Sequence, residues 1–306
     1  MQHIRMSRTR LARRGFTMVE LLVALVLLGL VSAALYRVLV NNQRLYMAQT
    51  QRIDLSQNIR AAGNIMPAEF RELDASDGDI TAMTATSISI HAMRWTGFVC
   101  IAPVLDGTVT GRVMTIRGGQ PGQAMFFGSR GVLVGTDSLY VYLDGNQTTR
   151  ADDYYVPSKL TAAAGALCPA AGVVPPQAGT ALTFDGNFFA GNNVAGAIPV
   201  GAPVWGFERI TYGLFQQPGD TSYYIGYQPA GGSMQPLIGP VLTNGLAFQY
   251  YDVNGNPTAV RTQVARIDIT VRARTTAAVR SGGQAPAATV VDSIVTSVAL
   301  RNNRRF

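Results

Sequence analysis

The longest uninterrupted run of hydrophobic positions lies near the N-terminus, from Phe16 to Tyr36, and reads FTMVELLVALVLLGLVSAALY. Its one ionisable residue is Glu20. Twenty apolar residues in a helix span about 30 Å, which is the thickness of the hydrocarbon core of a bilayer. No other segment of the sequence has this character. The pattern therefore predicts one membrane-spanning helix over residues 16–36.

Helical spacing of apolar positions continues beyond this run. The first proline after Tyr36 is Pro67, and apolar residues recur on one side of a helix at Leu55, Ile59, Ala62, Met66 and Leu73. A continuous helix from Phe16 to about Met66 would be about 76 Å long, which exceeds the diameter of a small domain. Its first half needs lipid or other subunits around it. Its second half, within residues 37–73, can pack on a globular head.

The composition and the spacing of apolar residues change from about Asp74 onwards. Short runs with alternating apolar positions, separated by Gly, Pro, Asn and Asp, predict β-strands at 87–93, 139–143, 210–214, 223–227, 248–253, 264–273 and 289–300. The middle, about 160–203, is rich in Ala, Gly and Pro and is predicted to be long loop. We therefore expect an α+β protein whose long N-terminal helix packs on a large antiparallel β-rich head over residues 74–306.

The net charge of +7 is concentrated at the N-terminus. Residues 1–15 hold five arginines and no acidic residue, so the rest of the chain carries about +2. This near-neutral remainder argues against nucleic acid as a partner, although the whole chain is basic. Arginines before a span favour a cytoplasmic N-terminus, which predicts a single-pass membrane protein with an exported head.

Two ordinary explanations compete for the N-terminal segment. A secretory signal peptide has a short apolar run and a small-residue cleavage site after it, whereas here the run is long and Gly15 precedes it. A plain membrane anchor gives no reason for Glu20. A carboxylate costs up to about 3 kcal/mol at the centre of a membrane helix, and less near its end, so it usually marks a function.

Residues 13–22 read RRGFTMVELL, which resembles the type III signal of type IV prepilins and pseudopilins. In that family a basic leader ends in glycine, and an inner-membrane prepilin peptidase cuts after it on the cytoplasmic side. The resemblance implies a cut between Gly15 and Phe16 that removes the leader 1–15, and N-methylation of Phe16. It also implies that Glu20 sets the assembly register, because its charge can offset the α-amino group of a neighbouring subunit.

Two further segments narrow the resemblance. The stretch DLSQNIRAAGNIMPAEFREL and the later YYDVNGNPTAV with VARIDITVRA are similar to minor pilins of the PilW type, and the first is also similar to GspJ-type minor pseudopilins. The PilW resemblance implies a subunit that lies first in the bacterial inner membrane with a periplasmic head and then in the pilus, where it initiates assembly and sits in the tip complex. Its partners would be other minor and major pilins and the assembly platform. A minor pseudopilin of a type II secretion system is the alternative.

The sequence contains little material for catalysis. Of its two histidines, His3 lies in the predicted leader, and His91 lies beside Ser87 and Ser89 on a predicted solvated strand face. The pattern predicts no enzyme and no cofactor. An inner-membrane-anchored periplasmic enzyme or binding module that keeps its N-terminus is nevertheless a competing hypothesis.

The remaining candidates concern cysteines and calcium. Cys100 and Cys168 lack metal-ligand spacing, so in an exported head they are expected to form a disulfide or to remain two free thiols. Two acidic clusters are weak calcium candidates, Asp74, Asp77 and Asp79 in one and Asp252, Asn254 and Asn256 in the other. Both lack the full loop signature, and turns explain them without a metal.

Overall fold

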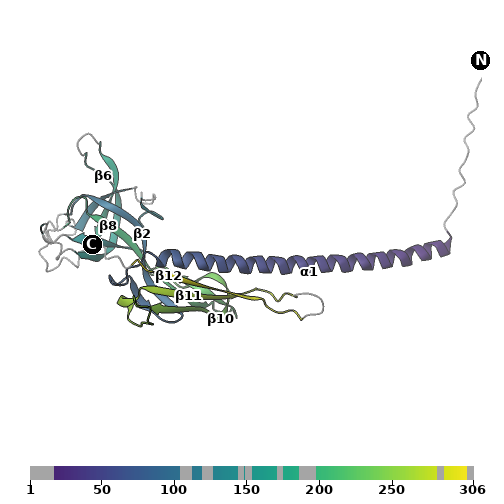
Figure 1. The fold of residues 1–306 in the computed structure, drawn as a ribbon. Helices are drawn as coiled ribbons and strands as arrows, with labels where there is room; N and C mark the ends of the chain where they lie inside the picture. The colour runs from purple at the N-terminus through teal and green to yellow at the C-terminus, as the bar shows by residue number, and fades with distance from the viewer. Residues whose placement is uncertain are drawn as a thin grey trace, which may run out of the picture.

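The computed structural model describes residues 17–103, 112–118, 127–143, 148, 154–170, 175–185, 198–280 and 286–301. One long helix, α1 (Met18–Phe70), leads into a β-rich head that packs on its last part, and the rest of the helix projects away from the head (Figure 1). The prediction of an α+β, pilin-like fold with an antiparallel head is confirmed.

The strands of the head pair in antiparallel fashion throughout the described residues. They are β1 (Ile80–Met83), β2 (Ser87–Ile101), β3 (Val113–Arg117), β4 (Phe127–Gly128), β5 (Asp137–Leu143), β6 (Tyr154–Cys168), β7 (Gln177–Phe184), β8 (Pro203–Gln216), β9 (Tyr223–Gln228), β10 (Gln235–Tyr251), β11 (Arg266–Arg274) and β12 (Val291–Ala299). A short 3-10 helix, η3 (Arg261–Gln263), precedes β11.

The strands form two lobes. In the first, β2, β3, β7, β6, β5 and β8 pair in this order, and β8 pairs back onto β2, so that the sheet closes into a barrel. We call this the barrel lobe. In the second, β1, β2, β8, β9, β10, β11 and β12 form an open sheet with α1 on one face, which we call the sheet lobe. Each lobe has its own hydrophobic core.

The long strands β2 and β8 belong to both lobes. Residues 87–93 of β2 pair with 207–213 of β8 in the sheet lobe, and residues 95–98 pair with 203–206 in the barrel lobe. The register shifts between Met93 and Trp95, so Arg94 is the extra residue of a β-bulge. A bulge bends a strand and increases its twist, which here lets one strand leave a flat sheet and enter a barrel.

Helix α1 packs on the sheet lobe through one face near its C-terminal end. Its buried apolar residues are Leu55, Ile59, Ala62, Met66, Pro67 and Phe70, and Leu73 follows as part of the same core. These residues recur every three or four positions, as one face of a helix requires. The predicted set of core-facing positions is therefore confirmed.

The predicted long loop at about 160–203 is wrong for much of its length. It contains most of β6 and all of β7, which pair from Leu160↔Phe184 to Cys168↔Gln177 and project from the barrel lobe (Figure 1). Alanine and glycine are depleted in strands and give no alternating pattern, so the sequence carries little signal here. Backbone pairing within the closed barrel determines the strand state instead.

Candidate functional site: the N-terminal segment and its helix

The predicted processing site lies at the edge of what the structure describes. Gly15 and Phe16 fall outside the described residues, which begin at Thr17. Thr17 is the N-cap of α1, and its hydroxyl accepts a hydrogen bond from the backbone N–H of Glu20 at 3.2 Å. The Glu20 Oε2 accepts one from the backbone N–H of Thr17 at 3.5 Å. The two bonds form a capping box, which satisfies two amide donors that a helix start leaves open.

This capping box gives Glu20 a role within its own chain. A carboxylate near a helix N-terminus is stabilised by the positive end of the helix dipole and by the open amide groups. Glu20 therefore helps to start the helix directly after the predicted cleavage point. The sequence analysis also expects the charge of this side chain to pair with the amino terminus of a neighbouring subunit. A charge role and a capping role can be separated by substitution.

Most of α1 has little protein around it, although near residue 51 the Gln51 side chain accepts a hydrogen bond from the Ala277 N–H at 3.1 Å. Across residues 18–54, all of which the structure describes, no side chain is buried, although the exposed residues include Leu25, Leu28, Leu35 and Ile53. By length and composition α1 is long and apolar enough to cross a membrane. A helix that is apolar on all sides needs lipid or other helices as its surroundings. The chain can thus be anchored in a membrane through the N-terminal part of α1.

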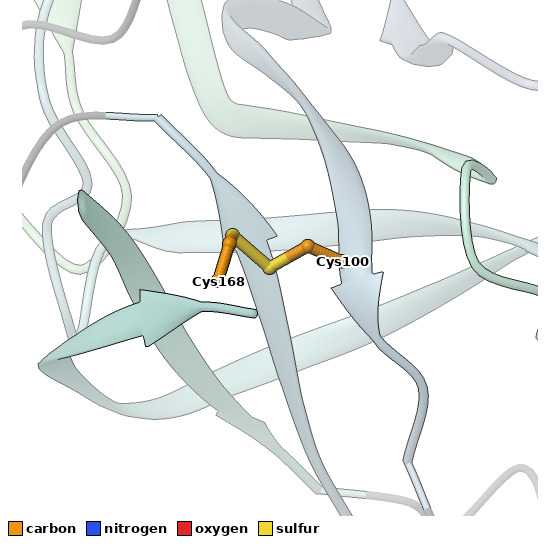
Figure 2. Close-up of a disulfide and its surroundings, with 2 residues drawn as sticks. All are labelled: Cys100 and Cys168. Carbon is orange, nitrogen blue, oxygen red and sulfur yellow. A yellow bond between two sulfur atoms is a disulfide. The ribbon is translucent and has the colours of Figure 1, made fainter. Parts of the chain in front are cut away.

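A disulfide joins Cys100 and Cys168, with a Cα–Cα distance of 5.6 Å (Figure 2). Cys100 lies on β2, where the register against β3 shifts between Val99 and Ile101, and Cys168 ends β6. A Cβ at Gly179 of β7 would lie 3.0 Å from the Cys168 sulfur and 2.8 Å from a backbone oxygen, so glycine gives the bridge room to pass. The disulfide ties together two barrel strands that do not pair with each other.

The prediction that His91 lies on a solvated face is wrong. His91 is buried, and its Nδ1 lies 2.7 Å from the Tyr140 hydroxyl, which donates to Asp79 Oδ1 at 3.1 Å. Because a hydroxyl has one proton to donate, Nδ1 of His91 is the donor in the first contact. The ring also packs on Phe207, with centroids 4.3 Å apart. Strand alternation placed His91 away from the core, but side chains of the neighbouring strands cover this face too.

The two acidic clusters cap turns. Asp74 Oδ1 accepts hydrogen bonds from the backbone N–H and hydroxyl of Ser76, and Asp79 Oδ2 accepts one from the Asp74 N–H. Asp252 Oδ1 accepts from the N–H groups of Asn254 and Asn256, and these bonds, chiefly that of Asn256, lower the pKa of Asp252. Among the described residues, no three His, Cys, Asp or Glu side chains are grouped so that they could hold a metal ion.

A partly buried ionic network, for which the sequence gives no signal, joins α1 to both lobes. The Arg94 guanidinium lies 2.8 Å from Glu69 of α1 and 3.1 Å from Glu208 of β8. Arg130 contacts Asp137 at 2.6 Å and the same Glu208 at 3.2 Å. Burial alone would lower the pKa of Arg94, but Glu69 and Glu208 outweigh it and raise the pKa. The five residues are far apart in sequence, so no local motif could reveal them.

Comparison with known families supports the processing motif. Residues 10–36 match the family model described as the prokaryotic N-terminal methylation motif, a range that includes Gly15, Phe16 and Glu20. The match supports a type IV pilin-like or pseudopilin-like protein, and it implies processing by a prepilin peptidase and contact with pilus components. Neither the comparison with curated proteins nor that with solved structures gives a match.

Proposed function

We propose that this protein is a minor type IV pilin, a structural subunit that helps to initiate pilus assembly and sits in the complex at the pilus tip. The observation that carries the proposal is the direct succession of a methylation motif and a helix whose residues 18–54 are unburied in the isolated chain. The apolar first part of this helix, up to Tyr36, is stable in lipid before assembly, and the whole of it among the helices of other subunits afterwards.

The mechanism that we propose is non-covalent. Prepilin peptidase cuts between Gly15 and Phe16, and Phe16 is then methylated. The apolar surface of α1 drives lateral packing with other pilins. Glu20 fixes the axial register, because its carboxylate and the amino terminus of a neighbour are both costly in an apolar bundle unless they meet.

The shape of the head supports a terminal position rather than a repeating one. Its barrel lobe and the hairpin of β6 and β7 add bulk beyond the sheet that packs on α1 (Figure 1). A subunit that repeats along a filament has neighbours above and below its head, whereas a subunit at the tip has none above. The ionic network around Arg94 connects α1 to strands of the head.

A minor pseudopilin of a type II secretion system is the second candidate, because the same motif serves both machines. Deletion of the gene separates the two functions. The proposal predicts loss of surface pili with normal secretion of exported enzymes, and recovery of pili when the gene is restored. Normal piliation together with blocked secretion would replace the proposal with the pseudopilin. Normal piliation with normal secretion would favour an anchored binding module or enzyme.

A further inference from the structure

A cavity of about 470 Å³ opens on the outer face of the head, away from both hydrophobic cores. It lies over β2, β5, β6 and β8, between the turns that contain Gly135 and Gly231. The polar and charged residues that line it include Lys159, Arg209, His91, Ser138 and Thr136. We call this site the basic cavity. Its volume falls within the range of about 300–1,000 Å³ that is typical of sites for small molecules.

Strand register explains why these side chains converge. Ser138 of β5 pairs with Lys159 of β6 on one side and with Phe207 of β8 on the other. Directly opposed residues of antiparallel strands point to the same face, so these three share the outer face. Arg209 lies two residues beyond Phe207 and faces the same way, and it pairs with His91 of β2. Four strands thus bring two cations to one cavity.

Neither cation forms an ion pair within the part of the chain that the structure describes, although the Asp185 carboxylate accepts a hydrogen bond from the backbone N–H of Lys159 at 3.3 Å. The ion pairs there involve Arg94, Arg130, Arg266 and His91, whereas Lys159 and Arg209 belong to none. Both side chains are exposed. Arg94 and Arg130, by contrast, each form ion pairs with two carboxylates.

The one acidic residue in the wall does not cancel this charge. Both oxygens of Asp137 already accept hydrogen bonds, Oδ1 from Arg130 at 2.6 Å and Oδ2 from the Trp95 indole N–H and the Leu133 N–H, each at 2.9 Å. Its carboxylate is therefore turned into the head and neutralised by Arg130. The lining also contains the Lys159 ammonium, the Arg209 guanidinium and the Ser138 hydroxyl, each of which can donate hydrogen bonds.

We propose that the basic cavity binds a small molecule through an oxyanion group, a carboxylate or a phosphate, held between Lys159 and Arg209. Arginine offers a planar pair of N–H donors that matches either group, and lysine adds a compact charge. The ring face of Phe207 and His91 in the floor and Pro157 in the wall supply the apolar contact for the remainder of the ligand. This binding is independent of the proposed role of α1 in assembly.

The chain itself provides a specific probe, because Lys159 is its only lysine. Reductive methylation of the full chain in detergent with ¹³C-formaldehyde labels Lys159 and the terminal amino group, and it preserves the charge of the amine. Two methyl resonances are then followed by NMR while glucuronate, glucose 6-phosphate or glucose is added. The three probes share a sugar ring and differ in their charged group.

The proposal predicts a saturable shift of the Lys159 resonance with at least one anionic probe and no shift with glucose or at the terminal amine. A response to glucuronate alone identifies a carboxylate ligand, a response to glucose 6-phosphate alone a phosphate ligand, and a response to both the shared oxyanion. Arg209→Gln should weaken binding about tenfold, as the loss of one charge-assisted contact does. Arg117→Gln, on an exposed position of β3 outside the cavity, should leave it unchanged.

Three results would overturn the proposal: no saturable shift with either anion, equal shifts at Lys159 and at the terminal amine, or unchanged affinity in Arg209→Gln. Near-UV circular dichroism checks that this variant is folded. If it is not, calorimetric titration of Lys159→Gln decides instead. Because the Lys159 side chain is exposed, its replacement should leave both cores intact. The loss of its charge should abolish binding.

Discussion

The carboxylate of Glu69, in the last turn of α1, lies 2.8 Å from the guanidinium of Arg94, the bulged residue at which β2 passes from the sheet lobe to the barrel lobe. This ion pair links α1 to the bulge of β2, where the sheet lobe and the barrel lobe meet. The Tyr212 hydroxyl donates to the other oxygen of Glu69 at 3.0 Å, so that both oxygens of the carboxylate are engaged.

Replacement of Arg94 by methionine should destabilise the head by about 2 kcal/mol, since removal of the cation from a partly buried ion pair leaves Glu69 without a charged partner, whereas Glu208 keeps Arg130. Two carboxylates, Glu69 and Glu208, lose a partner in this variant. Urea unfolding of the full chain in detergent, followed by tryptophan fluorescence, measures the change. Arg266→Met is the comparison, because the Arg266–Asp268 pair is more exposed, with side chains 43% and 19% exposed, and should contribute less than about 1 kcal/mol even with Arg266 lying over the Tyr251 ring. Equal effects of the two substitutions would contradict a structural role for the network.

Loss of the disulfide should cost the head about 4 kcal/mol. The cysteines are 68 positions apart, and in the chain-entropy model a loop of this length restricts the unfolded chain by about this amount. The double variant Cys100→Ala, Cys168→Ala is compared with the wild type in urea, with and without reductant. Reductant should lower the stability of the wild type and leave the double variant unchanged. Equal sensitivity of both proteins would exclude the bridge as the cause.

Substitution of Glu20 can separate its two roles. Glutamine at this position can still complete a capping box, whereas alanine cannot, and neither carries a charge. If pairing with a neighbouring amino terminus is required, both Glu20→Gln and Glu20→Ala should be cut and methylated but should assemble poorly. Pili in a strain that carries each variant, together with the mass of the membrane-extracted protein, provide the measurement. Normal assembly of Glu20→Gln would refute the charge role and leave only the capping role.

The head should lose stability at alkaline pH. Burial raises the pKa of Tyr212 and of Tyr250 above their ordinary value of 10.0, and the Glu69 carboxylate raises that of Tyr212 further. A group whose pKa is raised by folding contributes stability that is complete below pH 10 and decreases above it, because the unfolded chain releases the proton first. Urea midpoints should therefore fall above about pH 10, and Tyr212→Phe should show a smaller fall. An equal fall in that variant would rule out Tyr212 as the source.

The sequence predicts α1 well because its signals are local. Leu55, Ile59, Ala62 and Met66 repeat at the helical period, and all four are buried against the sheet lobe. The alternation of Leu139, Val141 and Leu143 likewise identifies a strand with one buried face. The turn at Pro218–Asp220 indicates the hairpin that β8 forms with β9. In each case a helix or strand buries one of its faces, and the spacing of its apolar residues indicates which face that is.

The parts that could not be predicted depend on contacts between distant segments. Closure of the barrel rests on the pairing of β2 with β8, more than a hundred positions apart, and no residue pattern encodes it. The strands in the Ala- and Gly-rich middle could not be predicted for a different reason, because alanine and glycine give no alternating apolar pattern. His91 was assigned to solvent because its own strand places it opposite Ile90, but Tyr140 and Phe207 of other strands cover it. The ionic network around Arg94 joins five positions that only the folded chain brings together.

The most direct test of the account is the mass and N-terminal sequence of the intact protein extracted from the membrane. We predict a chain that begins at Phe16, with one methyl group on its amino terminus and with residues 1–15 absent. Gly15→Val should remain uncut, because a side chain at this position obstructs close approach of the backbone to a protease. A mature protein that begins at Met1 would contradict the account. It would leave a membrane-anchored head that does not assemble as a pilin.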